Sequence, residues 1–140
     1  MGTGNDLWKE FEALLVRHEV DGLVSLYTSG AVWDAPAMRL EGAEAIRAYY
    51  ETYFKSCSDT RIETSRVIED GAIVVAEWTS WDTNTGPVTL PDGTEIAATG
   101  KTMELPGVSV VEVRNGRFAT VRDYVDSALW MSQLGLMAAG

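Results

Sequence analysis

The chain has 140 residues, of which 46% are hydrophobic and 23% charged, a composition typical of one soluble globular domain around a single core. Its formal net charge of −10 argues against nucleic acid and anionic membranes as partners. The single cysteine, Cys57, excludes an intrachain disulfide, and the single histidine, His18, excludes a histidine-rich zinc or iron site.

The N-terminal part predicts two helices and no targeting signal. MGTGNDLWKE lacks the basic and apolar regions of a secretory signal, and no apolar run reaches ~18 residues, so we expect a cytoplasmic protein. Residues 6–18 predict a helix, capped by Asn5 or Asp6. A second short helix is expected over residues 20–27, followed by a break at Ser29-Gly30. The apolar stripe of the first helix contains Leu7, Phe11, Leu14, Leu15 and His18.

Residues 31–56 predict a short strand and then the most regular helix of the chain. The strand, residues 31–38, is interrupted by Pro36, which is typical of an edge or a bend. The helix opens at Gly42, and we expect its Tyr50 to face a cavity and its Phe54 to face the core. Its strongly aromatic stripe contains Ile46, Tyr49, Tyr50, Tyr53 and Phe54.

After Ser58 the hydrophobic period changes from about 3.6 to 2. This predicts strands over residues 60–69, 72–84, 99–105 and 107–115, with turn signals at Asp70-Gly71 and Asn115-Gly116. Residues 83–99, rich in Gly, Pro, Asp and Thr, predict a long excursion within a hairpin and a candidate pocket lid. Helices first and antiparallel strands afterwards predict an α+β fold in which residues 1–140 form one domain.

The final stretch carries the strongest functional signal. Residues 117–125 predict a strand that runs into a closing helix, and alternate side chains of a strand face opposite sides. Asp123 therefore falls in the otherwise apolar row of Ala119, Val121 and Val125. A carboxylate on an inward face costs several kcal/mol unless it is paired, hydrogen-bonded or protonated, so Asp123 is a candidate functional group.

Four stretches of the chain resemble the SnoaL-like polyketide cyclases of the NTF2-like superfamily. They are VDGLVSLYTSGAVWDAP, LEGAEAIRAYYETY, AATGKTMELPGVSVVEVRNGRF and VRDYVDSALWMSQLG. The resemblance implies a curved, mostly antiparallel sheet wrapped around the N-terminal helices, with a conical cavity between them. It is less specific for activity, because the superfamily contains cyclases, isomerases, epoxide hydrolases, dehydratases and binding proteins.

The resemblance assigns a role to Asp123. In SnoaL-like cyclases the first aspartate of a D-x-x-D pattern in the last strand is the general base, and Asp123 is that residue here. Limonene-epoxide-hydrolase-like relatives carry an aspartate at the same place. They also need an Arg and an Asp where this chain has Trp78 and Ser80. Their first-strand Tyr and Asn fall on Trp33 and Ala35, so epoxide hydrolysis by that mechanism is disfavoured.

Ketosteroid isomerases are a third comparison. Their catalytic base corresponds to Ala35 in this chain, with Asp34 one residue away and on the other face. Their oxyanion-hole tyrosine falls on Phe11, and their oxyanion-hole acid falls near Ser109. Both halves of the isomerase mechanism are therefore absent from these positions.

These observations predict a cofactor-independent, cyclase- or isomerase-type enzyme with Asp123 as the catalytic base. It would abstract a proton from a carbon acid and close a ring by aldol chemistry, without a metal or an organic cofactor. The expected ligand is small and hydrophobic, with aromatic or polycyclic molecules suited to flat aromatic walls. The expected substrate-binding residues are Phe11, Trp33, Tyr50, Trp78, Ser80 and Ser109. Of these, Tyr50, Ser80 and Ser109 are the candidates for stabilising an enolate.

Other roles remain open for several residues. Asp123 could be a structural carboxylate, and Trp33, Tyr50 and Trp78 could be plain core. Asp126 is expected to cap the closing helix and Asp34 to lie at a rim.

His18 is expected to end the first helix, where a cation suits the dipole. The competing function is a non-catalytic binding or dimerising module. For a homodimer, which we also expect, the proposed interface residues on the face away from the pocket are Val110, Trp81 and Phe118.

Overall fold

The computed structural model describes residues 3–36, 38–90 and 92–136. Helices come first and most strands afterwards, so the predicted α+β class is confirmed. The elements are α1 (Gly4–Val16), α2 (Val20–Ser25), β1 (Tyr27–Ala35), β2 (Met38–Glu41), α3 (Ala43–Ser56), β3 (Cys57–Asp70), β4 (Ile73–Asn84), β5 (Val88–Thr89), β6 (Glu95–Ile96), β7 (Thr102–Arg114), β8 (Arg117–Val125) and α4 (Ser127–Gln133).

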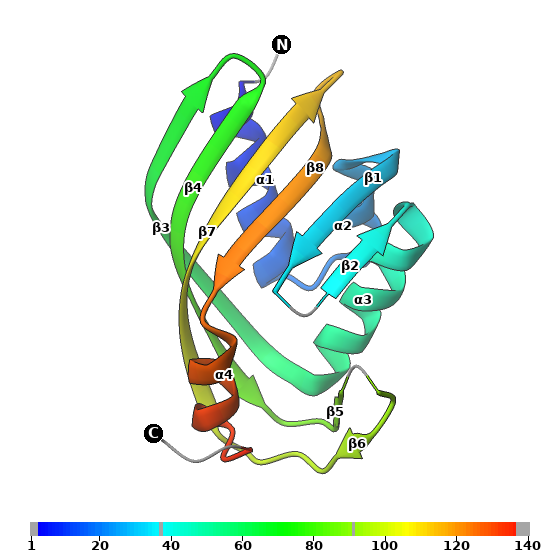
Figure 1. Ribbon diagram of the computed structural model, residues 1–140, viewed down its shortest axis with the longest axis vertical. Coiled ribbons are helices and arrows are strands. Elements are labelled where there is room, and N and C mark those ends of the chain that lie inside the picture. The colour runs from blue at the N-terminus through cyan, green and yellow to red at the C-terminus, as the bar shows by residue number, and fades with distance from the viewer. Residues whose placement is uncertain (1–2, 37, 91, 137–140) are drawn as a thin grey trace.

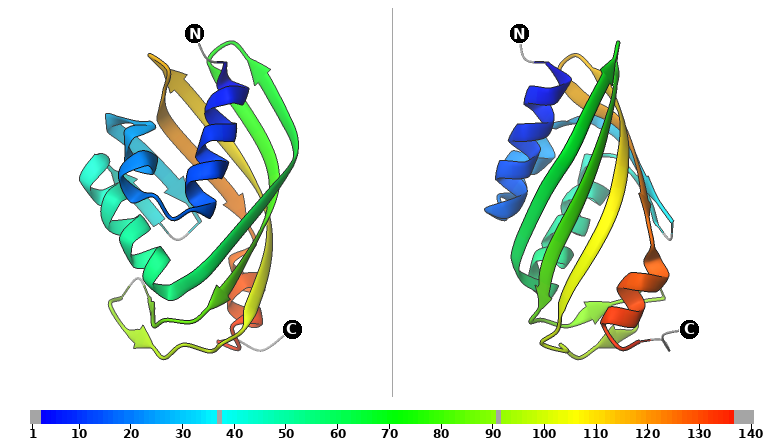
Figure 2. Two further views of the ribbon diagram at one scale, coloured as in Figure 1. Left: turned by 180° about the vertical axis from the view of Figure 1, so that it is seen from behind. Right: turned by 90° about the vertical axis from the view of Figure 1, so that its left-hand side faces the viewer.

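Six of the strands form one curved sheet in the order β2-β1-β8-β7-β4-β3. Neighbouring strands are antiparallel except β1 and β8, which run parallel. The long strands β3, β4 and β7 bend across the molecule (Figure 1), and α1, α2 and α3 lie together on one face of the sheet (Figure 2). The predicted curved, mostly antiparallel sheet around the N-terminal helices is confirmed.

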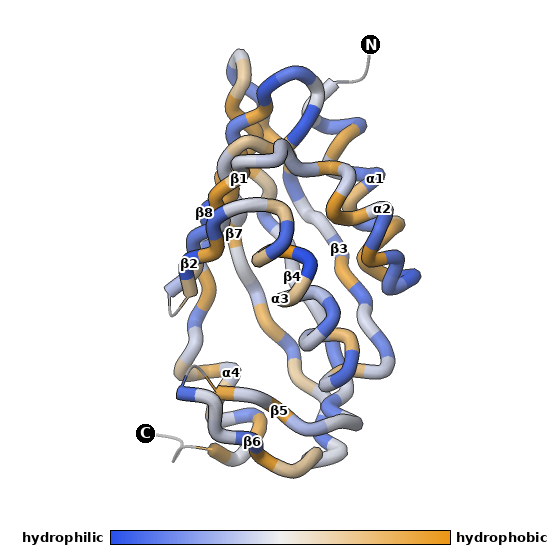
Figure 3. Tube along the Cα trace, turned by 90° about the vertical axis from the view of Figure 1, so that its right-hand side faces the viewer, coloured by the Kyte–Doolittle hydropathy of each residue, from blue (hydrophilic) through white to orange (hydrophobic). Residues whose placement is uncertain are grey.

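The core lies between the helix layer and the sheet. Hydrophobic and hydrophilic residues alternate along α1 and along the strands (Figure 3), as the two periodicities predict. One stripe of each helix and every second residue of the central strands therefore meet in the middle. The side chains that are almost fully buried there include Trp8, Leu23, Ile46, Tyr50, Val74, Val111 and Phe118.

The first helix begins earlier than its stripe predicts. Thr3 is the N-cap: its hydroxyl accepts from the backbone N–H of Asp6, and the Asp6 carboxylate accepts from the backbone N–H of Thr3. This reciprocal capping box satisfies two otherwise unpaired donors. The caps proposed on Asn5 or Asp6 are therefore wrong, because Asp6 is the third residue of α1. The α3 prediction is confirmed, with Gly42 as its N-cap.

The predicted break at Ser29-Gly30 is wrong, since β1 runs without interruption from Tyr27. The small residues coincide instead with an irregularity: the pairing of β1 with β8 shifts register between Tyr27 and Val32. The proline signal is correct, because Pro36 follows β1 in the turn that leads to the edge strand β2.

The two strands predicted over residues 99–105 and 107–115 are one continuous strand, β7. Pro106 does not break it, because β8 pairs with β7 only from Gly107 onward. Pro106 thus lies where one edge of β7 has no partner strand, the place where sheets tolerate proline. Helix α4 covers that edge, and the Gln133 side chain exchanges two hydrogen bonds with the Glu104 backbone.

The excursion over residues 83–99 contains the small hairpin of β5 and β6. Asn84, which is fully buried, ties its two ends together. Its amide donates to the carbonyls of Ser56 and Gly86, and its oxygen accepts from the backbone and hydroxyl of Thr99. Among the described residues, no helix is long and apolar enough to cross a membrane.

Candidate functional site

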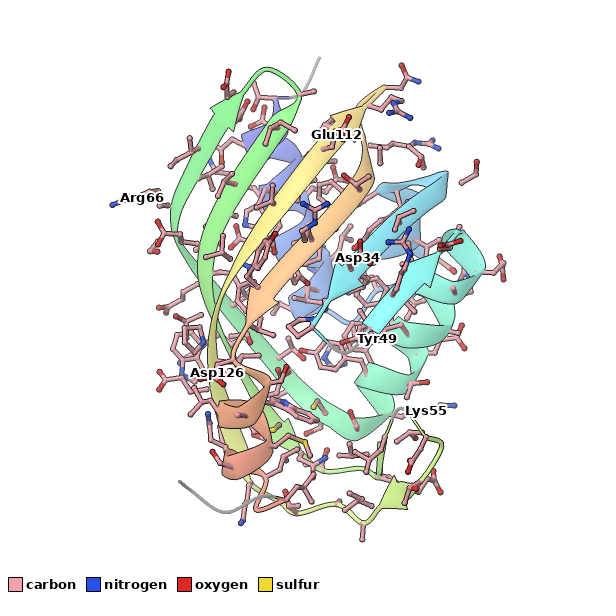
Figure 4. All side chains as sticks on the ribbon, in the orientation of Figure 1. Asp34, Tyr49, Lys55, Arg66, Glu112 and Asp126 are labelled. Carbon is pink, nitrogen blue, oxygen red and sulfur yellow. The ribbon has the colours of Figure 1, made fainter. Side chains whose placement is uncertain are left out.

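A cavity of about 400 Å³ lies between the helix layer and the sheet. Its volume is within the range of small-molecule sites, and its wall is strongly aromatic. The aromatic side chains that line it are Trp8, Phe11, Tyr27, Trp33, Tyr49, Tyr50, Tyr53, Trp78, Phe118 and Trp130. Figure 4 shows Tyr49 on α3, directed toward the sheet.

Asp123 lies on the wall of this cavity, held by two side chains from neighbouring strands. The indole N–H of Trp33 on β1 donates to its Oδ2 at 2.8 Å. The hydroxyl of Ser109 on β7 donates to its Oδ1 at 2.6 Å. Ser109 in turn accepts from the indole N–H of Trp78 at 2.9 Å. The central position of β8 between β1 and β7 brings these groups together (Figure 1).

The environment of Asp123 makes it a stronger base than a solvated aspartate. Burial raises its pKa, and the hydrogen bonds from Ser109 and Trp33 oppose that effect only in part, so the pKa stays above its usual value. The Ser109 hydroxyl uses its only hydrogen on Asp123, so it has none left for a ligand oxygen. Ser109 is therefore a partner of the carboxylate rather than an enolate donor in this arrangement.

Tyr50 faces the cavity and Phe54 packs in the core, as predicted. The Tyr50 hydroxyl shares a hydrogen bond of 2.7 Å with the hydroxyl of Tyr27, and only 1% of the residue is exposed. Burial, followed by the neighbouring Tyr27, raises the pKa of Tyr50 well above its usual value, so this phenol is neutral at physiological pH. One of the two hydroxyl hydrogens of the pair is not used in the bond between them.

The fold brings all of the sequence-predicted site residues to this one cavity. Phe11 comes from α1, Tyr50 from α3, Trp33 from β1, and Ser109 and Asp123 from β7 and β8. Trp78 and Ser80 lie two residues apart on β4, both on the cavity wall. Their roles toward a ligand remain a proposal.

The prediction that Phe118 lies on the face away from the pocket, which rests on the alternation of side chains along the strand, is wrong. Phe118 is 2% exposed and lines the cavity. The cause is a register shift between β7 and β8 at Glu112 and Val113, after which both Phe118 and Ala119 are buried. Phe118 cannot belong to an outer-face interface.

Asp82 is a second carboxyl group on the cavity wall that the sequence reasoning missed. The hydroxyl of Tyr53 donates to both of its oxygens, at 2.8 and 2.9 Å. Burial raises the pKa of Asp82, while the hydroxyls of Tyr53 and Thr60 lower it in part. The signal was present in the sequence, because Trp78, Ser80 and Asp82 share one face of β4 by their spacing.

The remaining acidic candidates lie outside the cavity. Asp34 forms an ion pair of 2.9 Å with Arg39 across β1 and β2, and Asp126 caps α4 by accepting from the backbone N–H of Leu129 at 3.0 Å. The rim and capping roles predicted for them are thus confirmed; both residues are labelled in Figure 4.

His18 does not act as a cation at the end of α1. It lies beyond the C-cap with a φ of 56° and hydrogen-bonds Thr60 at 2.8 Å, and its ring stacks on Phe54 with centroids 4.0 Å apart. Burial lowers its pKa, with the charge of Asp59 opposing, which favours the neutral ring. The prediction that His18 acts as a cation on the dipole of α1 is wrong. Its hydrogen bond and its stacking on Phe54 give it a structural role instead. No group of three or more His, Cys, Asp or Glu side chains in the described ranges could hold a metal ion.

The chain was compared with known proteins. The family profile described as "SnoaL-like domain" matches residues 8–121. No curated protein sequence matches. TsrD from Streptomyces laurentii is similar in structure, with a TM-score of 0.80, 22% identity and coverage of 95% of each chain.

Two further solved structures are similar. A candidate SnoaL-like polyketide cyclase from Jannaschia sp. CCS1 has a TM-score of 0.81 and 16% identity, covering 96% of this chain and 92% of that one. A protein with a ketosteroid isomerase-like fold from Catenulispora acidiphila, solved in complex with trimethylamine, has a TM-score of 0.79 and 14% identity, covering 96% of each chain. At these identities the likeness to solved structures shows the fold alone.

Proposed function

Because the chain belongs to the SnoaL-like domain family, we propose that it is a cofactor-independent, cyclase-type enzyme for a small hydrophobic, polyketide-like molecule. The observation that carries this proposal is Asp123, a carboxylate with a raised pKa on the wall of an aromatic cavity of ligand size. A base of this kind is suited to removing a proton from carbon near neutral pH.

The proposed reaction is an intramolecular aldol closure. Asp123 takes the proton of an activated C–H bond, and the electron pair of that bond moves into an enolate. The enolate carbon then attacks an internal carbonyl carbon, so that a C–C bond forms, and the carbonyl oxygen takes up the proton from Asp123. The aromatic wall would hold the folded substrate with the reacting carbons close together.

The enolate oxygen needs a hydrogen-bond donor. Since Ser109 is committed to Asp123, we propose the free hydroxyl hydrogen of the Tyr27 and Tyr50 pair, or the hydroxyl of Ser80, which also lies on the wall. Neither group carries positive charge, so the stabilisation would rest on neutral hydrogen bonds.

A non-catalytic binding protein is the competing function, and one observation favours it. Both oxygens of Asp123 already accept hydrogen bonds, which stabilises the ionised form and weakens the base. An epoxide hydrolase with an altered site is less well supported, because Trp78 and Ser80 stand where the resemblance requires an arginine and an aspartate. An isomerase of the ketosteroid type is less well supported, because Ala35, Phe11 and Ser109 stand at the positions of its base and its oxyanion-hole groups.

Proton exchange at carbon separates the enzyme from the binder. Tetralone, a hydrophobic aryl ketone, is incubated with the protein in D₂O, and the loss of its α-proton signal is followed by NMR. We expect the protein to accelerate exchange and Asp123→Asn to reduce the accelerated rate by about 10²-fold or more. Asp34→Asn, which removes an equal charge outside the cavity, is the matched control.

Binding of tetralone without accelerated exchange would favour the binding protein. Acceleration that survives Asp123→Asn would remove Asp123 from the mechanism. Affinity for tetralone, measured in parallel, must be similar in the parent and in Asp123→Asn for the rate comparison to report on the base.

We also propose a homodimer through the outer face of the sheet. Val108 and Val110 on β7 lie opposite Tyr124 and Arg122 on β8, and Tyr124 is 54% exposed. In a dimer with twofold symmetry, the same face of each copy would cover Tyr124 and the partly buried valines beside it.

A further inference from the structure

The charged groups on the cavity wall have one sign. Asp82 and Asp123 both line the cavity, and among the described residues no Lys, Arg or His does. An ionised carboxylate in a largely apolar site is costly unless a positive charge or several hydrogen bonds compensate it. The wall of this cavity therefore offers negative charge and no positive charge to a ligand.

Neither carboxyl group has a cationic partner within the described part of the chain. Asp123 accepts from the neutral groups of Trp33 and Ser109, and Asp82 accepts from the neutral hydroxyl of Tyr53. The ion pairs among the described residues all involve other acids: Asp21, Asp34, Glu41, Glu77 and Glu112. Each carboxyl group thus has lone pairs left and, when ionised, a charge that no cationic side chain among the described residues balances.

Electron-rich rings lie between the two carboxyl groups. The rings of Trp33 and Tyr49 are 4.9 Å apart, and those of Tyr49 and Tyr53 are 6.1 Å apart, measured between centroids. Trp33 donates to Asp123 and Tyr53 to Asp82, so the three rings span the distance from one carboxylate to the other. Burial, then the charges of Asp123 and Asp82, raise the pKa of Tyr49.

We infer that the ligand of this cavity is a hydrophobic organic cation, a protonated amine or an iminium ion, held by Asp123 against the rings of Trp33 and Tyr49. Asp82 lies at the other end of the row of rings, since it pairs with Met103 of β7 whereas Asp123 pairs with Ser109. Aromatic faces attract cations, and more strongly where water is excluded. The inference names the ligand class of the cavity proposed above as the ligand site. It therefore rests on that assignment, but not on the proton-transfer chemistry.

A cationic substrate also simplifies the proposed chemistry. When a carbon next to an iminium carbon loses a proton to Asp123, the C–H electron pair forms a C=C bond and the C=N π pair moves onto nitrogen. The product is a neutral enamine. No negative oxygen develops, so the cavity needs no positively charged group to stabilise one, in agreement with its wall.

The test uses three probes of similar size and different charge on the intact protein. They are naphthylmethylamine, which is protonated at pH 7, naphthylmethanol, which is neutral, and naphthoate, which is an anion. Isothermal titration calorimetry at about 0.15 M salt, where surface charges are screened, gives the three dissociation constants. We expect the amine to bind about tenfold or more tightly than the alcohol, and the anion to bind most weakly.

Variants locate the selectivity. Asp123→Asn should weaken amine binding about tenfold and leave alcohol binding within about twofold, and Asp82→Asn, which lies farther from the bound charge, should weaken amine binding less. Asp34→Asn changes the net charge of the protein equally but lies outside the cavity, so it should change neither. Because the three probes are compared first on the parent protein, the result does not depend on any variant folding.

Equal affinity for amine and alcohol would overturn the inference and leave the cavity as the site of a neutral ligand. Amine selectivity that Asp34→Asn reduces as much as Asp123→Asn would also overturn it, since it would then reflect only the net charge. Failure of all three probes to bind would overturn the cavity as a ligand site for molecules of this size, and the proposed function with it. Selective amine binding together with no tetralone exchange would keep this inference and remove the proposed proton transfer from tetralone-like ketones.

Discussion

Asp123 links the stability of the protein to pH. Its pKa is raised in the folded state by burial, despite the hydrogen bonds from Ser109 and Trp33, above the unfolded value near 3.9. The folded state therefore binds more protons than the unfolded state between these two values. The free energy of unfolding is highest, with respect to this group, below the unfolded pKa and falls as pH rises from about 4 through the folded pKa.

Asp123→Asn should remove this dependence. Asparagine can direct its oxygen to Trp33 and its amide to Ser109, whose oxygen has a second lone pair beside the one that Trp78 uses. We expect the variant to be at least as stable as the parent at pH 8, with a smaller advantage at pH 5. Urea denaturation of both proteins at the two pH values measures it.

The control is Asp126→Asn, because asparagine caps a helix as well as aspartate does and Asp126 is the N-cap of α4. A loss at pH 8 of about 1.5–3 kcal/mol for each charged hydrogen bond would instead mark Asp123 as an ionised structural carboxylate. That outcome would contradict its role as the base.

The position of a single residue could be predicted from the sequence where the periodicity of its own strand determines which face its side chain occupies. Asp123 stood out because a strand alternates and its row was apolar. Its partners Trp33 and Ser109 reached the same list only through the resemblance and their apolar neighbourhood, because a bond across 90 residues of chain depends on which strands pair. Asp82 was missed although it shares a face of β4 with Trp78 and Ser80, because the resemblance assigns roles only to positions 78 and 80 of this strand.

At the scale of the elements, a glycine of β7 makes room for the Trp78 ring on the cavity wall. Gly107 lies directly opposite Trp78 of β4, and a Cβ atom there would be 2.5 Å from Cη2 and 2.6 Å from Cζ2 of the indole. The indole cannot move freely, because its N–H donates to Ser109. Gly107 therefore leaves the room in which the Trp78 ring covers the sheet.

We expect Gly107→Ala to destabilise the protein by about 1–3 kcal/mol, the usual cost of overpacking, and to shift the NMR signal of the Trp78 indole N–H. Gly30→Ala is the control, because nothing lies within 4 Å of a Cβ at that position of β1. Alanine there should be neutral or slightly stabilising. Equal effects of the two substitutions on the free energy of unfolding would show that Gly107 does not accommodate the indole.

Elements were predicted well where local signals agree with tertiary context. The helix after Gly42, the strand 117–125 and the turn at Asn115-Gly116 were correct, and both turn residues have the positive φ that such hairpins require. Ser29-Gly30 and Pro106 failed as break signals. In each case the pairing with the neighbouring strand determines whether the strand continues. The register shift between β1 and β8 accommodates Ser29-Gly30, and Pro106 lies where β7 has no partner strand on the β8 side.

At the scale of the molecule, α1, α2 and α3 cover one face of the sheet and leave most of the other face open (Figure 2). If the open face is a dimer interface, Tyr124→Lys should place an unpaired charge within it. We expect the parent to be a dimer and the variant a monomer by size-exclusion chromatography with light scattering, with unchanged circular dichroism.

Val16→Lys is the matched control, since Val16 is 47% exposed on α1 and far from the open face of the sheet. It adds the same charge and should leave the dimer intact. A parent that is monomeric at all concentrations tested would refute the interface outright.

The parallel pairing of β1 with β8 has a consequence for the order of folding. Residues 27–35 can pair only after residues 117–125 have been synthesised. Neither the centre of the sheet nor the bond from Trp33 to Asp123 can therefore exist until residues 117–125 have left the ribosome. Closing so long a loop is entropically costly and slow compared with forming the β3–β4 hairpin, which pairs residues close in sequence. The hairpin can assemble before β8 is made, whereas the cavity can form only after β8 has left the ribosome. Until β8 is available, the aromatic residues of α3 and β1 consequently remain exposed to solvent. This incomplete chain is the state in which the protein is most prone to aggregate.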